Sequence, residues 1–555
     1  MPSSVRFLTV RMFSLLLLLF FHLRACHSSP SMHPLCHEEE SHALMQFKQS
    51  LVINESASSD PSAYPKVASW KVDGESRDCC SWDGVECDRD SGHVIGLDLS
   101  SSFLYGSIDS NSTLFHLVHL GRLNLAGNNF NNSEIPSEIR NLPRLFDLNL
   151  SMSVFSGQIP AEILELSKLV SIDLRWNSLK LQKPGLQHLV EALTNLEVLH
   201  LSGVDISAKV PQIMANLSSL SSLFLSHCGL QGEFPLGIFQ LPNLRFLSIR
   251  SNPHLTGYLP EFKSGSQLEN LLLEGTNFSG QLPESIGNLK SLKEFRAAKC
   301  YFSGAIPSSL GNLTKLNSLD LSYNSFSGEI PSTFVNLLQL TYLSLSSNNF
   351  SGKIPSTFVN LLQLTYLSLS SNNFSGKIPS TFVNLLQLTY LSLSSNNFSE
   401  FPSFLHGQNH LEFVELSGNK IEGHIPKWFM NLGTETLWCL DLYGNFLTGF
   451  EQSVDILPWN NLRDLELSGN KLEGALPIPP RLCGKPLSRK CGNGEDSLPA
   501  AKRDEGSAAY PLEFGWKVVV TGYASGLVIG VILGCVMDTR KYEWLVKNYF
   551  ARWQR

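Results

Sequence analysis

One 24-residue segment is repeated in the middle of the chain without a single substitution. It begins at Pro331 as PSTFVNLLQLTYLSLSSNNFSGKI, begins again at Pro355, and runs a third time from Pro379 to Ser399, where Glu400 ends the identity. Because each copy has the same local preferences, the three copies are expected to fold into three equivalent units. The feature predicts a repeat architecture, and a length of 555 residues agrees with it because one ordinary core does not grow to that size.

The triplicated segment belongs to a longer series of similar units. The pattern L-x-x-L-x-x-L-x-L-x-x-N-x-F/L-x-G-x-I-P recurs at a period of about 24 residues, for example in LFDLNLSMSVFSGQIP and LNSLDLSYNSFSGEIP. We count about 16 units across 93–480. This is the leucine-rich-repeat signature, which predicts an α/β solenoid with a parallel sheet on its concave face.

Within each unit the pattern separates core positions from surface positions. Leu319 and Leu321 are predicted to point into the core of a short strand, and Ser318, Asp320 and Ser322 to point outward from it.

A recurrent asparagine follows the strand. Its side chain is expected to bond backbone groups of adjacent turns that burial would otherwise leave unpaired. Cys228 and Cys300 fall at the same position, where a structural thiol is expected rather than a reactive one. The asparagines include Asn324, Asn348, Asn372 and Asn396.

The outward positions of the strands supply candidate ligand contacts. The triplication places Tyr342, Tyr366 and Tyr390 at one concave position, roughly 5 Å apart from coil to coil, where they could stack on a peptide or a glycan. The alternative, which the residues alone favour, is that duplication placed them there without a binding role. Further candidates, by position only, are Asp173, Arg175, His200, Arg250, Glu274, Arg296 and Asp320.

The N-terminus is typical of a secretory signal peptide over 1–29. Arg6 and Arg11 precede an uncharged run from Met12 to Phe21, and small residues follow. The alternative is an N-terminal membrane anchor.

A second apolar run, 518–537, is long enough to cross a bilayer as a helix of about 30 Å. An acidic segment, 494–517, precedes it, and a basic tail, 538–555, follows. The positive-inside rule then places the long N-terminal part outside the cell and the tail in the cytosol, as in a single-pass type I protein of the plasma membrane. The tail is too short for a kinase. The alternative for the run 518–537 is a buried core helix.

Glycines recur at every fourth position of this run. Such spacing lets another helix approach closely, so the run is predicted to pack against the helix of a signalling partner. The alternative is a span that merely tolerates glycine. These residues are Gly522, Gly526, Gly530 and Gly534.

The cysteines of a secreted chain suggest disulfide-bonded caps at both ends of the repeats. The N-terminal cap, 30–92, contains Cys36, Cys79, Cys80 and Cys87, for which three pairings exist. A bond between the adjacent Cys79 and Cys80 would be strained. The C-terminal cap, 481–493, offers a bridge between Cys483 and Cys491.

Catalytic, cofactor and metal motifs are not evident. The segment HEEESH at 37–42 resembles a metalloprotease motif, but its histidines are too far apart to share a helix face as in H-E-x-x-H. A charged fraction of 16% and a net charge of −7 also disfavour nucleic-acid binding. We therefore expect no enzyme activity, no cofactor and no bound metal.

Asparagine glycosylation is expected in the N-terminal cap and along the repeats, because sequons of the form N-x-S/T are frequent in this secreted segment. The sequon asparagines are Asn54, Asn111, Asn131, Asn149, Asn216, Asn277, Asn312, Asn349, Asn373 and Asn397.

Taken together, CCSWDGVEC, the N-x-F-S-G-x-I-P units, LCGKPLSRKC, GYASGLVIGVILG and KYEWLVKNYF resemble the plant leucine-rich-repeat receptor-like proteins, the class of the tomato leaf-mould resistance receptors. The resemblance implies disulfides Cys36–Cys79 and Cys80–Cys87 and a second short strand in each unit. It also implies an adaptor receptor kinase on the glycine stripe and a co-receptor kinase recruited by ligand. The chain departs from the family where LELSGNKLEGALPIPP leads directly into RLCGKPLSRKC, without the usual island and last repeats.

The resulting hypothesis is a cell-surface receptor-like protein of plant defence. It would sense an extracellular ligand of pathogen origin and signal through a partner kinase. The alternatives are a non-signalling decoy, a binding protein similar to inhibitors of cell-wall enzymes, and a developmental peptide receptor.

Overall fold

The computed structural model of the protein describes residues 35–71, 78–452 and 457–473, all within the first of two compact units, Met1–Leu482. The predicted signal peptide, C-terminal cap with Cys483 and Cys491, acidic segment, membrane span with its glycine stripe, and tail lie outside the described residues. Within the described ranges, no helix combines the length and the apolar character that a membrane crossing requires.

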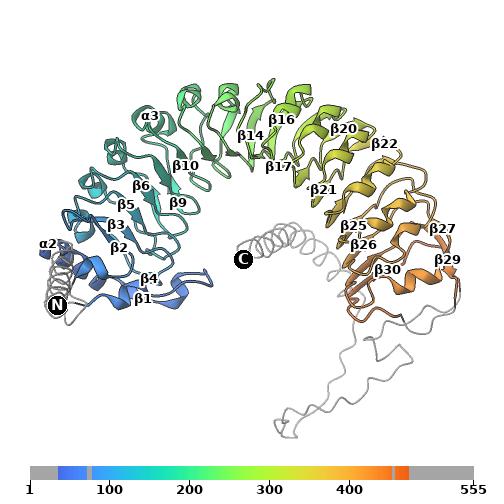
Figure 1. Cartoon of the computed structure of the whole chain (residues 1–555), viewed down its shortest axis with the longest axis horizontal. Helices are drawn as coiled ribbons and strands as arrows, with labels where there is room; N and C mark the ends of the chain where they lie inside the picture. The colour runs from blue at the N-terminus through green and yellow to red at the C-terminus, as the bar shows by residue number, and fades with distance from the viewer. Residues whose placement is uncertain (1–34, 72–77, 453–456, 474–555) are drawn as a thin grey trace, which may run out of the picture. The chain divides into compact units, whose positions relative to one another are not determined.

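Parallel strands line the inner side of the curved solenoid (Figure 1). Each pairs in register with the strand of the next coil, so that Leu319 lies opposite Leu343, and Leu343 opposite Leu367. Sixteen such strands lie in the described part, in agreement with the predicted number of units. In order they are β3 (Val94–Asp98), β5 (Arg122–Asn124), β6 (Asp147–Asn149), β8 (Ser171–Asp173), β10 (Val198–His200), β11 (Ser222–Phe224), β13 (Phe246–Ser248), β15 (Asn270–Leu272), β17 (Glu294–Arg296), β19 (Ser318–Asp320), β21 (Tyr342–Ser344), β23 (Tyr366–Ser368), β25 (Tyr390–Ser392), β26 (Phe413–Glu415), β28 (Cys439–Asp441) and β30 (Asp464–Glu466).

The second half of many units adds another short strand, as the resemblance implied. These strands form a seven-stranded sheet and two smaller parallel pairs. The seven-stranded sheet contains β12 (Gln231–Glu233), β14 (Asn252–Gly257), β16 (Thr276–Gly280), β18 (Tyr301–Gly304), β20 (Ser325–Gly328), β22 (Asn349–Gly352) and β24 (Asn373–Phe374). The pairs are β7 (Ser156–Gln158) with β9 (Ser178–Lys180), and β27 (Glu422–Ile425) with β29 (Phe446–Phe450).

The helical segments are mostly single 3₁₀ turns, which differs from the helices that an α/β solenoid implies. Within the repeats many follow a proline, and with only three to five residues they are too short to establish α-helical bonding. The α-helices among the described residues are α2 (Glu38–Gln49) and α3 (Leu186–Ala192). The 3₁₀ turns are η1 (Glu55–Ala57), η2 (Lys66–Ser69), η4 (Cys79–Ser81), η5 (Thr113–His116), η6 (Ser137–Asn141), η7 (Ala161–Glu165), η8 (Gln212–Asn216), η9 (Leu236–Gln240), η10 (Glu284–Asn288), η11 (Ser308–Asn312), η12 (Ser332–Asn336), η13 (Ser356–Asn360), η14 (Ser380–Asn384), η15 (Ser403–Leu405) and η16 (Lys427–Asn431).

Leucine and phenylalanine fill the interior between the two sides of each coil. The predicted core residues Leu319 and Leu321 are fully buried. Phe326 stacks on Phe350, and Phe350 on Phe374, at centroid distances of 6.1 and 6.2 Å. Since each coil offers its neighbour the same shape, identical units continue the core without a defect.

The recurrent asparagine forms a hydrogen-bonded ladder along the solenoid, as expected. Asn348 Nδ2 donates to the carbonyls of Leu321, Leu345 and Ser346, and its Oδ1 accepts from the amide of Phe326. The side chain thereby satisfies backbone groups of two coils at once.

The two cysteines at this position have the same structural role. Cys228 Sγ donates to the carbonyl of Leu201 at 3.2 Å, and Cys300 Sγ to that of Leu273 at 3.4 Å. Burial raises the pKa of the Cys228 thiol to about 12 and also raises that of Cys300, so both thiols stay protonated near neutral pH.

The N-terminal cap closes one end of the solenoid. Disulfides join Cys36 to Cys79 and Cys80 to Cys87, the pairing that the resemblance implied. Helix α2 packs over the first repeats through Ala43, Leu44 and Phe47. Strand β2 (Val85–Cys87) runs antiparallel to β3, and β1 (Val52–Ile53) runs antiparallel to β4 (Leu104–Tyr105).

Candidate ligand-binding surface

An aromatic ladder crosses four neighbouring coils on the concave face. It consists of Tyr342, Tyr366, Tyr390 and Phe413, each the first residue of its strand. The parallel register places these residues opposite one another, with ring centroids 4.3, 4.1 and 4.3 Å apart along the row. Trp438 lies against Phe413 at 5.5 Å and is 38% exposed, so it ends the ladder with an accessible ring.

The stacking changes the binding mode expected for the tyrosines. Both faces of Tyr366 are covered by the neighbouring rings, so a ligand meets ring edges and hydroxyl groups rather than open aromatic faces. Burial, and then the adjacent Tyr342, raise the pKa of Tyr366; burial and then Tyr366 raise the pKa of Tyr390. The ladder therefore presents a neutral surface with polar edges.

An ionic cluster adjoins the other end of the ladder. The Arg296 guanidinium carbon lies 5.5 Å from the Tyr342 ring centroid, in a cation–π arrangement. Arg296 Nε also lies 2.6 Å from Glu294 Oε1 within the same strand, and Arg250 Nη1 donates to Glu274 Oε1 at 3.1 Å. Charges of both signs thus lie next to an apolar stack, a combination suited to a polypeptide ligand.

Two carboxylates in and beside this cluster, Glu274 and Asp320, are held in a low-dielectric environment. Burial raises the pKa of Glu274, against the effect of Arg250 and Arg296. Burial likewise raises the pKa of Asp320, against the hydrogen bonds from Ser322. Arg296 and Arg250 are more accessible, with 23% and 31% of their side chains exposed, so the arginines are the available charges.

Ser318, Asp320 and Ser322 point outward from the core as expected, but neighbouring side chains cover them. They lie on the concave side of the sheet, but only 7%, 5% and 5% of each residue is exposed. The Tyr342 hydroxyl lies 3.5 Å from Asp320 Oδ2, and Ser322 Oγ donates to Asp320 Oδ1 at 2.6 Å. Short side chains on a concave sheet are covered by longer neighbours, so Asp320 supports the surface and does not form part of it.

The remaining sequence candidates gather at a separate place, nearer the N-terminal cap. Asp173 Oδ2 lies 3.0 Å from Arg175 Nε and 3.2 Å from His200 Nδ1. The His200 ring stacks on Phe224 at 4.3 Å, and the Arg175 guanidinium lies 5.9 Å from the Phe224 centroid. These contacts hold the polar groups in place, and 34% of the Arg175 side chain remains exposed.

Sequence reasoning missed several members of this surface. Phe413 and Trp438 complete the ladder, Glu294 pairs with Arg296, and Phe224 supports His200. Aligning LEFVELS with LTYLSLS would have found Phe413, because it occupies the tyrosine position. The partners of the other residues depend on neighbouring coils, which a single repeat does not reveal.

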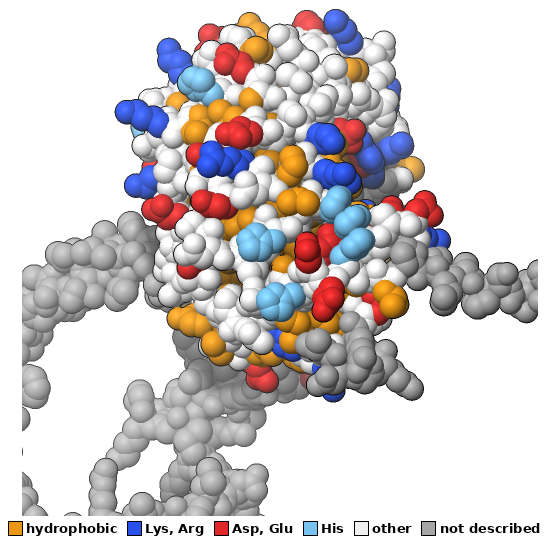
Figure 2. Space-filling view, turned by 90° about the vertical axis from the view of Figure 1, so that its left-hand side faces the viewer, with side chains coloured by type: hydrophobic (Ala, Val, Ile, Leu, Met, Phe, Trp, Pro, Cys, Tyr) orange, Lys and Arg blue, Asp and Glu red, His pale blue; other side chains and the backbone are white. Residues whose placement is uncertain are grey.

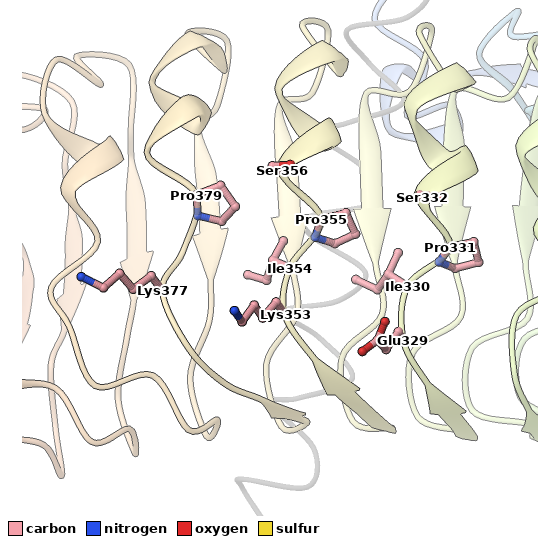
Figure 3. A pocket seen from close by; sticks show the side chains of 10 residues that line it. All are labelled: Glu329, Ile330, Pro331, Ser332, Lys353, Ile354, Pro355, Ser356, Lys377 and Pro379. Atoms are coloured by element: carbon pink, nitrogen blue, oxygen red, sulfur yellow. The ribbon is translucent and has the colours of Figure 1, made fainter.

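A groove between successive coils offers about 530 Å³ but is a weaker candidate (Figure 3). It repeats the same turn three times, and Glu329, Lys353 and Lys377 occupy equivalent positions along it. Lys377 is 78% exposed at its side chain and pairs with Glu400 at 2.9 Å. Solvated charges around a Pro-Ser turn provide little fixed geometry for a ligand.

The predicted sequons leave the ladder uncovered. Most of their asparagines are exposed, and Asn349 and Asn373 lie on the second strands β22 and β24. Asn149, by contrast, lies on the concave strand β6, far along the sheet from β21. Glycans at these positions would not occupy the surface from β17 to β28.

Comparisons with known proteins agree with this architecture. The leucine rich repeat N-terminal domain matches residues 37–88, and leucine rich repeat models match 267–289, 315–337, 339–398 and 410–432. Receptor-like protein 6 of Arabidopsis thaliana is 41% identical over 297 residues, and receptor-like protein Cf-9 of Solanum pimpinellifolium is 36% identical over 289.

The described part of the chain is a leucine-rich-repeat solenoid, and its sequence is similar to those of plant receptor-like proteins.

The match to these curated relatives is partial. It spans 51% of this chain and 30% of receptor-like protein 6, and 50% of this chain and 33% of Cf-9. The chain therefore aligns with about a third of the length of the relatives that it matches.

Solved plant receptor structures share the fold. The PEPR1–AtPEP1 complex superposes with a TM-score of 0.56 at 28% identity, covering 69% of this chain and 59% of that one. The Arabidopsis receptor kinase HAESA, in complex with the peptide hormone IDA and the co-receptor SERK1, gives 0.53 at 27% identity, covering 80% and 87%.

Proposed function

We propose that this protein is a single-pass cell-surface receptor-like protein that senses an extracellular ligand in plant defence and signals through a partner receptor kinase. The match to receptor-like proteins of Arabidopsis and Solanum supports the receptor class. The sequence supports the membrane placement through the signal peptide, 1–29, and the span, 518–537.

The ligand class that the concave surface fits best is a peptide. The observation that carries this proposal is the continuity of the aromatic ladder with the arginines of the ionic cluster, from Arg250 to Trp438. Ring edges and hydroxyls suit an extended backbone, and Arg296 and Arg250 can pair with carboxylates. PEPR1 and HAESA, of the same fold, are seen in complex with AtPEP1 and with IDA.

The partners that we propose are an adaptor receptor kinase and a co-receptor kinase. The stripe from Gly522 to Gly534 supports close helix packing with the adaptor. The presence of SERK1 beside HAESA supports co-receptor recruitment by a ligand-bound solenoid.

Transient expression of the full chain in leaves tests this function. Peptide extracts from the apoplast of infected leaves are applied, and the oxidative burst is measured against leaves without the chain. We expect a burst that requires the chain and weakens at least tenfold in Tyr366→Ala/Trp438→Ala, while Lys377→Ala, on the groove between coils, responds as the native chain does. An equal burst from the native chain, the double variant and Lys377→Ala would contradict a concave ligand site.

A developmental peptide receptor is the second candidate, because HAESA binds a peptide hormone. Extracts of uninfected leaves separate the two functions. A response to those extracts alone would favour development, and binding without any response would favour a decoy or an inhibitor-like protein.

A further inference from the structure

A buried carboxylate on the cap helix faces two histidines from neighbouring coils. Glu40 lies on the same face of α2 as the core residues Ala43, Leu44 and Phe47, and is only 6% exposed. Its Oε1 lies 3.3 Å from His93 Nδ1 and 3.4 Å from His119 Nδ1. Figure 2 shows histidine and acidic side chains close together on the face that carries the cap.

The repeat geometry brings the two histidines together. Gly96 of β3 pairs with Arg122 of β5, so His93 and His119, each three residues earlier, occupy equivalent positions of adjacent coils. Their rings stack at 3.6 Å. The two histidines of the segment 37–42 are too far apart to bind a metal as in H-E-x-x-H, yet Glu40 of this segment contacts histidines that lie far away in the sequence.

The buried charge of Glu40 is only partly compensated. Its Oε2 accepts a hydrogen bond from the Val94 amide at 2.9 Å, and among the described residues its ion-pair partners are histidines, not lysine or arginine. The Nδ1 atom of His119 is buried and has no hydrogen-bond partner in the described structure. A buried carboxylate is costly unless a positive charge and hydrogen bonds compensate it, and an unbonded buried nitrogen adds to that cost.

We propose that Glu40, His93 and His119 form a binding site for a Zn²⁺-class divalent cation that clamps the cap helix to the first two coils. Two imidazole nitrogens and one carboxylate oxygen form a donor set that such ions accept. Bonds of about 2.1 Å in a tetrahedron place ligand atoms about 3.4 Å apart, close to the two N–O separations. Because an imidazole binds a metal in the plane of its ring, the stacked His93 and His119 rings must turn away from each other to bind one ion. The Val94 amide orients the carboxylate, as an outer-shell hydrogen bond does in metal sites.

The neighbouring groups do not compete for this role. The cap cysteines also lie close together, but they are joined in disulfides and have no thiolate to offer. His37 stacks on His93 at 3.8 Å, and its Nε2 is bonded to the Ser91 carbonyl at 2.9 Å. His42, on the exposed side of α2, provides a matched control on the same helix.

Co²⁺ titration of the purified full-length chain, oxidised and in detergent, tests the site. We expect one equivalent with the visible absorption of tetrahedral Co²⁺, displaced by Zn²⁺. The affinity should fall at least tenfold in His93→Gln, His119→Gln and Glu40→Gln and stay unchanged in His42→Gln. No such absorption, or native affinity in the three site variants, would overturn the proposal.

Zinc-edge X-ray absorption of the native chain does not depend on the folding of any variant. It should show only nitrogen and oxygen ligands, with imidazole scattering. A sulfur shell would place the ion at cysteines and would also overturn the proposal.

Discussion

The ring of Tyr366 lies 4.1 Å from the ring of Tyr390, and the two planes differ by 9°. Tyr342 covers the opposite face at 4.3 Å. Replacing Tyr366 with alanine removes two stacked pairs, for which we expect a loss of about 1–3 kcal/mol in the free energy of unfolding. Tyr366→Phe keeps both pairs and should remain close to the native value. Urea unfolding of the two variants makes the comparison, and an equal loss in both would show that the hydroxyl matters more than the stacking.

The asparagine ladder should contribute more than surface asparagines do. Asn372 Nδ2 donates to the carbonyls of Leu345, Leu369 and Ser370, and its Oδ1 accepts from the Phe350 amide. Asn372→Ala leaves these backbone groups without a partner, and we expect about 2–3 kcal/mol of destabilisation. Asn336→Ala, an exposed position in η12, is the control and should change stability little. Equal denaturation midpoints for the two variants would contradict the role of the ladder.

Cys228 should be chemically inert in the folded chain. Burial raises its pKa from 9.0 to about 12, so the fold favours the protonated thiol. The raised pKa of Cys228 contributes to the free energy of unfolding. This contribution is complete below pH 9 and is lost as the pH rises from about 9 towards 12, because the thiol of the unfolded chain ionises first. Iodoacetamide at pH 8 should label Cys228 only after denaturant is added, as mass spectrometry of the peptide will show. Rapid labelling of the native chain would contradict this account.

The glycine stripe should control association with the partner kinase. Gly526→Leu with Gly530→Leu places bulk on the face where a second helix would approach. We expect recovery of a receptor kinase from plant membranes to fall several-fold, while Val528→Leu with Ile532→Leu, elsewhere on the span, leaves recovery unchanged. Equal recovery from both pairs would argue against helix packing through glycine.

The sequence predicts those features of the fold that one repeat determines by itself. The burial of Leu319 and Leu321 and the bonding of Asn348 follow from a period that every coil shares. The covering of Asp320 does not follow, because it depends on Tyr342 in the next coil and on the curvature of the sheet.

The candidate surface was predicted in outline only. Position within the strand identified Tyr366 and Arg296, but not the pairing of rings that closes the aromatic faces. The triad of Glu40, His93 and His119 was invisible to motif reasoning, because its members come from a helix and two coils. Contacts between units are decided by register, and register becomes visible only when the coils are stacked.

Photo-cross-linking from the concave face tests the central claim most directly. A photoreactive amino acid replaces Trp438, at the accessible end of the ladder, or Tyr301, which is 65% exposed on the second strand β18. Each full-length chain is irradiated with the apoplastic peptide extract that elicits the response. The account predicts a peptide covalently attached at position 438 and none at position 301. Attachment at 301 alone, or equally at both positions, would contradict a ligand site on the concave face.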